Sequence, residues 1–250
     1  MPRKPTPASV AAEIRRRLKS DGSGERARGI EWFFKEEIKS QGWRTADLRR
    51  LARRSSRALG DEHGLDFVVG VADRLFTGRV LEEKVFAVLL LENLTARFDD
   101  HHFALFESWL DRIRTWADHD GLVHGVIAPM IQAEPTRARK VFAWAKSTHR
   151  WHRRAACVAL IQGTRRKMFF PQVTRLSNML LADGDDMVQK GLGWLLRETA
   201  KADGPRTVPY LMQIRSRAPR LVLRTATETL PGRTRATILA KPFAEPRAII

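Results

Sequence analysis

The chain has 250 residues, of which 43% are hydrophobic, and this balance predicts a folded globular protein. It carries 45 lysines and arginines against 28 aspartates and glutamates, a formal charge of +17, so the expected partner is a polyanion. The single cysteine excludes an intrachain disulfide, and no run of 18 apolar residues is present to cross a bilayer.

The first two segments of clear pattern read as amphipathic helices. In residues 29–42, GIEWFFKEEIKSQG, the apolar positions Ile30, Phe33, Phe34 and Ile38 share one face, and the helix is predicted to end at Gly42. Residues 45–60, TADLRRLARRSSRALG, follow as an arginine-rich helix. Thr45 is the expected N-cap of this second helix.

Residues 81–98, LEEKVFAVLLLENLTARF, are apolar on nearly all sides between Val85 and Leu91. A helix of this kind is predicted to be buried. Further helices are predicted at residues 102–116, 119–132, 136–146, 149–162, 170–182, 185–202, 205–216 and 219–230. Prolines stand near the ends or first turns of these helices, except Pro129 and Pro209, which could kink them.

Short helices of similar length joined by brief turns are typical of stacked helical pairs. Internal sequence identity is weak, so this interpretation depends on the lengths and regular spacing of the helices, which fit the period of about 40 residues of HEAT-type repeats. The prediction is an all-α protein whose antiparallel helical pairs form a curved solenoid with a basic concave face. Residues 1–230 are expected to form a single domain, and residues 231–250 a tail that is partly disordered.

The distribution of basic residues along the chain distinguishes between possible partners. Basic residues recur along the whole chain, whereas a lipid-binding protein concentrates them on one amphipathic helix, so nucleic acid is favoured over a membrane. A charge that serves solubility alone is the alternative. The N-terminal segment lacks the apolar core of a secretory signal, and the lone cysteine fits a reducing compartment. We therefore expect a cytoplasmic monomer, associated with the nucleoid through DNA.

Several chemistries have no support in the sequence. There is no glycine-rich phosphate loop and no HExxH motif, and the histidines lack the regular spacing of metal ligands, so neither a cofactor nor a metal is expected. Cys157 lies in the apolar run RAACVALI and is predicted to be a small core residue.

Three segments combine tryptophan with charged residues at helical spacing. In TWADHDGLV, Trp116 and Asp120 are four residues apart and share a face, while Asp118 points elsewhere; an N-cap role for Asp120 is the alternative. In RWHRRAACVAL, Arg154 lies at the start of a helix, where it could bind a phosphate or belong to a solvated basic turn.

The third segment is QKGLGWLLRETAK, residues 189–201. Two glycines precede Trp194, and helical side chains lean toward the N-terminus, so the indole is expected to lie over Gly191 and Gly193 with room for a ligand. Lys190 and Arg197 flank it as candidate phosphate contacts. The alternative is a tryptophan packed in the core.

Taken together, WADHD, WHRRAACVAL and VQKGLGWLLRETAK resemble the HEAT-like repeat DNA glycosylases of the AlkD family of DNA alkylation repair enzymes. The resemblance covers roughly residues 25–230 and is most specific in QKGLGWLLRETAK. It implies excision of cationic alkylated purines, such as 3-methyladenine and 7-methylguanine, from double-stranded DNA.

The resemblance also implies a set of site residues on the concave face. By position they are the catalytic Trp116, Asp120 and Trp194, with Arg154 at a phosphate. Basic residues in GTRRKMFF stand later than the family pattern places them, so no phosphate contact is assigned there. The runner-up is a non-catalytic helical-repeat module that binds DNA by shape and charge, and a protein–protein scaffold is the third class.

Overall fold

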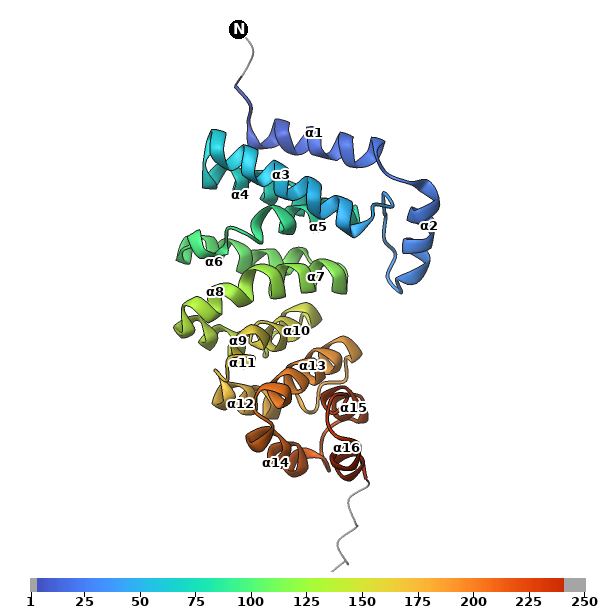
Figure 1. Ribbon diagram of the computed structural model, residues 1–250, viewed down its shortest axis with the longest axis vertical. Helices are drawn as coiled ribbons and strands as arrows, with labels where there is room; N and C mark the ends of the chain where they lie inside the picture. The colour runs from blue at the N-terminus through green and yellow to red at the C-terminus, as the bar shows by residue number, and fades with distance from the viewer. Residues whose placement is uncertain (1–3, 241–250) are drawn as a thin grey trace, which may run out of the picture. The chain divides into compact units, whose positions relative to one another are not determined.

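The protein is helical throughout the part that the computed structural model describes, residues 4–240 (Figure 1). No strand occurs among these residues, and the nearest feature is an isolated bridge between Lys39 and Val80. The all-α prediction is confirmed. The chain divides into two compact units, Met1–Met130 and Ile131–Ile250, with the division inside helix α8 (Ala128–Ala133).

Unit 1 is built from seven α-helices that precede α8. They are α1 (Pro7–Ser20), α2 (Gly24–Phe33), α3 (Thr45–His63), α4 (Leu65–Phe76), α5 (Leu81–Leu91), α6 (Asp100–Ser108) and α7 (Trp116–Leu122). Helix α5 contacts α1, α3, α4 and α7, so it forms the centre of the unit. Phe86 to Leu91 are all buried, which confirms the buried helix predicted there.

The first predicted helix is wrong in its position. Helix α2 ends at Phe33, and Figure 1 shows it turned away from the direction of α1 at one end of unit 1. Residues 34–43 form a loop instead, because the buried carboxylate of Glu82 satisfies their backbone. It accepts hydrogen bonds from Gln41 N at 2.8 Å and Gly42 N at 2.9 Å, and from the hydroxyl of Ser40 at 2.7 Å.

Two further details of unit 1 differ from expectation. Thr45 is the first residue of α3 rather than its cap, since Arg44 holds the cap position without a side-chain hydrogen bond. Between α7 and α8 the chain forms a π-helical turn, Val123–Ile127. Pro129 follows it and has no N–H to donate to the preceding turn, so this proline marks an irregularity of the helix.

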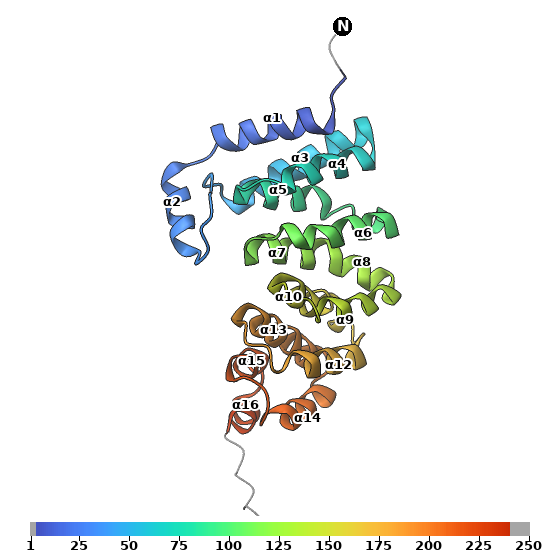
Figure 2. The same ribbon diagram turned by 180° about the vertical axis from the view of Figure 1, so that it is seen from behind.

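Unit 2 is organised around its longest helix. Its α-helices are α9 (Lys140–Trp144), α10 (Arg150–Val158), α11 (Ile161–Thr164), α12 (Phe170–Leu180), α13 (Asp186–Ala202), α14 (Gly204–Ile214), α15 (Arg220–Ala226) and α16 (Gly232–Leu239). Helix α13 packs against α10 on one side and α15 on the other, as Figure 2 shows. This succession places α10, α13 and α15 in one row, as stacked helical pairs require.

The C-terminal part of unit 2 contains Pro209 and the last described helix, α16. Pro209 lies inside α14, which continues to Ile214. The predicted tail begins with α16, a helix that buries Ile238, and residues 241–250 lie outside the described residues. Within residues 4–240, no helix combines the length and apolar character that crossing a membrane requires.

Candidate active site

Helix α7, which carries Trp116 and Asp120, begins at a tightly bonded cap. Thr115 is the N-cap, and Asp118 at the third helical position completes a capping box with it. Asp118 accepts from Thr115 N at 2.7 Å and lies 3.3 Å from the ammonium of Lys84 on α5. Both side chains of this ion pair are buried, at 1% and 4% exposure. Asp118 therefore holds α7 on α5 and is not available to a substrate.

Asp120 occupies a different position one half-turn further along α7. It lies inside the helix, so the N-cap alternative is wrong. Its side chain is 22% exposed, and Oδ1 is 2.7 Å from Nδ1 of the buried His119. The structure thus separates a buried structural aspartate, Asp118, from a partly exposed one, Asp120, as the spacing predicted.

Trp116 is half-buried and belongs to an aromatic cluster with α2. Its indole stacks on Phe34, with ring centroids 5.2 Å apart and planes 10° apart, and meets the edge of Phe33 at 6.3 Å. Phe33 and its neighbour Trp32 are largely exposed, at 67% and 88%. Helical spacing did not reveal this cluster, because the helix predicted over residues 29–42 included Phe34, which follows the last residue of α2.

Arg154 and Arg153 on α10 have distinct surroundings in unit 2. Arg153 forms an ion pair with Asp183 at 2.6 Å and donates to two backbone carbonyls, which makes it a structural residue. Arg154 is 6% exposed, and one guanidinium nitrogen donates to Met187 O at 2.7 Å. Its side chain therefore lies along the first turn of α13.

The two glycines of α13 have a structural cause that corrects the sequence interpretation. A Cβ on Gly193 would lie 2.6 Å from Cβ of Thr225 and 3.1 Å from Val222 O, so this glycine admits α15. A Cβ on Gly191 would meet Cγ of Arg154 at 3.2 Å. The glycines make room for neighbouring helices rather than for a ligand above Trp194.

Trp194 itself is half-buried, whereas Leu195 and Leu196 beside it are fully buried. The basic residues that flank it form ion pairs. Lys190 lies 3.0 Å from Asp186, and Arg197 pairs with Glu198 at 3.4 Å and with Glu228. A phosphate contact by either residue therefore competes with a carboxylate already in place.

A row of exposed arginines lies along one side of helix α3 in unit 1. A shallow hollow on this helix is lined by a set named here the arginine face: Arg49, Arg50, Arg53, Arg54 and Arg57. Among the described residues, no carboxylate lies within 4.0 Å of the last three of these side chains. The spacing of three and four residues brings them to one side of the helix, which suits the phosphates of a polyanion.

Among the described residues, the possible metal ligands are dispersed and the one thiol is buried. Over residues 4–240, histidine, cysteine, aspartate and glutamate side chains form no group of three that could hold a metal ion. Cys157 is fully buried, which confirms it as a core residue, and burial raises the pKa of its thiol to about 12. A thiol with that pKa does not act as a nucleophile near neutral pH.

Fold and composition together define an all-helical repeat protein with a strongly basic surface. The profile of the family described as "DNA alkylation repair enzyme" matches residues 14–230, and the chain belongs to this family. The resemblance expected from the sequence is thereby confirmed, and with it a role in the repair of alkylated DNA. No curated protein matches the chain significantly.

Solved structures share the fold at low identity. A predicted DNA alkylation repair enzyme from Enterococcus faecalis superposes with a TM-score of 0.76 at 16% identity, covering 84% of this chain and 97% of its own. AlkD2 from Streptococcus mutans gives 0.62 at 16% identity, with 89% and 100% covered. The smu.31 protein of Streptococcus mutans UA159 gives 0.55 at 19% identity, with 74% and 100% covered.

Proposed function

We propose that the protein is a DNA glycosylase that hydrolyses the N-glycosidic bond of cationic alkylated purines in base excision repair. The substrates are 3-methyladenine, 7-methylguanine and bulkier adducts in double-stranded DNA, attacked without extrusion of the base into a fitted pocket. The observation that carries the proposal is the partly exposed carboxylate of Asp120, four residues after the stacked Trp116, in a chain of a DNA alkylation repair family.

The chemistry needs one carboxylate because the leaving group is activated by its own charge. As the bond from C1′ of the sugar to the purine nitrogen breaks, the electron pair moves to the purine, which leaves as a neutral base. Positive charge then develops on the sugar, and Asp120 stabilises it electrostatically and orients the water that adds to C1′. That water releases one proton, so no general acid is required, in contrast to glycosidases that use two carboxyls.

The remaining residues have supporting roles. The indoles of Trp116 and Trp194 present aromatic faces, which stabilise positive charge on a sugar packed against them. Arg154 is assigned to a backbone phosphate, with Lys190 and Arg197 as further phosphate contacts. The arginine face of α3 adds sequence-independent affinity for the duplex. The protein would act as a cytoplasmic monomer on nucleoid DNA.

The decisive experiment is release of free 3-methyladenine and 7-methylguanine from methylated duplex DNA. We expect Asp120→Asn to bind DNA as the wild type does but to excise about 10² times more slowly, the scale of losing a main electrostatic stabiliser. Asp118→Asn is unsuitable as its control, because that carboxylate is in a buried ion pair. The control is Asp66→Asn, which also removes one negative charge, from a side chain that is 95% exposed.

The outcomes separate the two classes of function. Loss of excision in Asp120→Asn with full activity in Asp66→Asn supports the glycosylase. If the wild-type protein binds the duplex tightly yet releases no base from several lesions, the protein is a non-catalytic DNA-binding module.

A further inference from the structure

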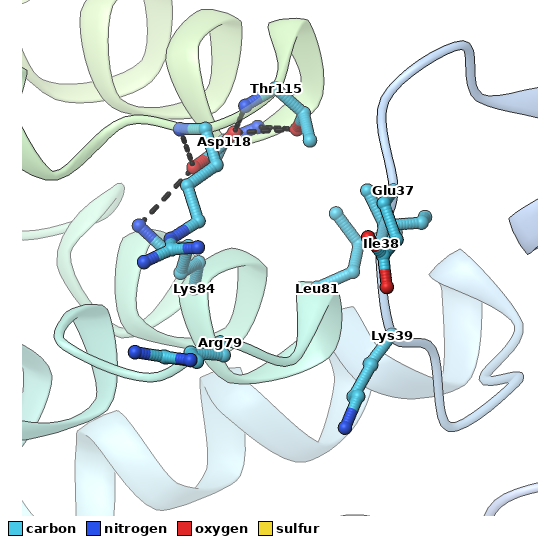
Figure 3. Close-up of a pocket in the computed structure, with 9 residues that line it drawn as sticks. Glu37, Ile38, Lys39, Arg79, Leu81, Lys84, Thr115 and Asp118 are labelled. Carbon is cyan, nitrogen blue, oxygen red and sulfur yellow. Dashed lines mark hydrogen bonds and ion pairs between the residues drawn. The ribbon is translucent and has the colours of Figure 1, made fainter.

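A solvent-open cavity of about 280 Å³ lies inside unit 1, immediately before the helix that carries Trp116 (Figure 3). Three segments form its walls: the loop of residues 37–39, the chain that enters α5, and the residues that precede α7. The charged side chains that line it are Glu37, Lys39, Arg79, Lys84, Arg114 and Asp118. We name this cavity the anion pocket.

The carboxylate of Asp118 is already fully engaged. It accepts from the backbone N–H groups of Arg114 at 3.0 Å and Thr115 at 2.7 Å, from the hydroxyl of Thr115, and it pairs with Lys84. Figure 3 shows these contacts gathered on one side of the cavity. Asp118 therefore balances the charge of Lys84, and the remaining charges of the lining are three cations and the carboxylate of Glu37.

Three of those cations are exposed at the cavity wall. Within the described part of the chain, no carboxylate oxygen lies within 4.0 Å of the side-chain nitrogens of Lys39, Arg79 or Arg114. Arg79 and Lys39 lie on opposite sides of the cavity in Figure 3. Four cationic side chains line this one cavity against two carboxylates, those of Asp118 and Glu37, so the net charge of its lining is positive and attracts an anion.

The electrostatics of Lys84 agree with a surplus of positive charge. Burial lowers the pKa of its ammonium, Asp118 opposes that shift, and the guanidinium groups of Arg114 and Arg112 lower the pKa further. An anion in the cavity would relieve this repulsion. On the loop side, Ile38 and Leu81 add apolar surface beside Glu37 and Lys39, and this surface suits the carbon atoms of a sugar.

We propose that the anion pocket binds a phosphodiester of the DNA strand next to the alkylated nucleotide, with Arg79 and Arg114 as its main ligands. This proposal rests on DNA being the substrate, as proposed above. Arg114 and Thr115 directly precede Trp116 in the chain, so a phosphate held here fixes the register of the strand against that indole. Guanidinium groups suit this role because they bind phosphate oxygens in a bidentate manner.

The test is the salt dependence of affinity for an undamaged duplex. Each phosphate contact contributes about 0.9 to the slope of log K against log salt, so Arg79→Gln and Arg114→Gln should each lower it by about one and the double variant by about two. Arg16→Gln, at an exposed arginine of α1, is the matched control and should lower it less. Thermal unfolding of all variants should match the wild type, because neither pocket arginine forms an ion pair.

Two results would overturn the assignment. One is a double variant whose slope equals that of Arg16→Gln. The other combines two measurements on the double variant: it no longer binds inorganic phosphate, yet its slope of log K against log salt for the duplex equals that of the wild type. The pocket would then bind a small free anion and not the DNA strand. This assay measures binding to undamaged DNA and does not depend on excision. A wild-type protein that releases no purine would therefore refute the glycosylase proposal but not the assignment of the anion pocket.

Discussion

The ring of Phe34 lies parallel to the indole of Trp116, 5.2 Å away, and joins the segment after α2 to the first residue of α7. The stack covers one face of the indole and fixes its plane. If that plane positions a sugar beside Asp120, Phe34 is a positioning residue although it touches no reacting atom.

Removing the stack should therefore slow catalysis more than it weakens binding. A stacked aromatic pair is worth about 0.5–1.5 kcal/mol beyond its buried area, so we expect Phe34→Ala to slow single-turnover release of 3-methyladenine up to about tenfold. Phe34→Tyr keeps the ring and should retain the rate. Equal losses in both variants, with unchanged unfolding temperatures, would assign the effect to something other than the stack.

The loop that follows Phe34 depends on Glu82, and its loss should destabilise unit 1. Gln41 N and Gly42 N donate to different oxygens of Glu82, and Glu82→Gln replaces one of these oxygens by an NH2 group that cannot accept; an unsatisfied buried donor costs about 1–3 kcal/mol. We expect a lower free energy of unfolding in denaturant titrations. Glu13→Gln, at an exposed glutamate of α1, should change nothing, and a Glu82→Gln protein as stable as the wild type would contradict this account.

Glu82 also shows what the sequence could and could not predict. Helical spacing within a segment located the start of α5 at Leu81 and both ends of α13 closely, because a helix depends on residues three and four positions apart, while the predicted end of α5 was too late. The spacing in residues 29–42 is equally helical, yet the part after Phe33 forms a loop, held by the carboxylate of Glu82 about 40 positions away. The same limit applies to the site: the separation of Asp118 from Asp120 follows from periodicity, while the stack of Phe34 on Trp116 depends on how α2 ends.

The glycines of α13 are a second feature that depends on residues far away in the sequence. Gly193→Ala would place a methyl group 2.6 Å from Cβ of Thr225, so α13 and α15 must move apart, and overpacking of this kind costs about 1–3 kcal/mol. Thermal unfolding should show the loss. Gly204→Ala is the matched control, since nothing lies within 4 Å of a Cβ at that position. A Gly193→Ala protein that melts like the control would revive the idea of open space beside Trp194.

Substitutions of Trp194 and Trp144 should distinguish a tryptophan of the site from a tryptophan of the core. It is half-buried, whereas Trp144 in the same unit is 4% exposed and packs in the core. Truncating a core tryptophan costs about 3–5 kcal/mol, so Trp144→Ala should unfold at a much lower temperature, while Trp194→Ala should lose clearly less stability.

Activity should follow the opposite order at a temperature where both variants are folded. Trp194→Ala should excise 3-methyladenine slowly, because the aromatic face that stabilises a cationic sugar is gone, and Trp194→Phe should fall between it and the wild type. Trp144→Ala should retain its rate once folded. Thermal unfolding and single-turnover excision on the same preparations decide the matter. A Trp194→Ala protein that is as unstable as Trp144→Ala, with activity lost in proportion to unfolding, would make Trp194 part of the core of unit 2.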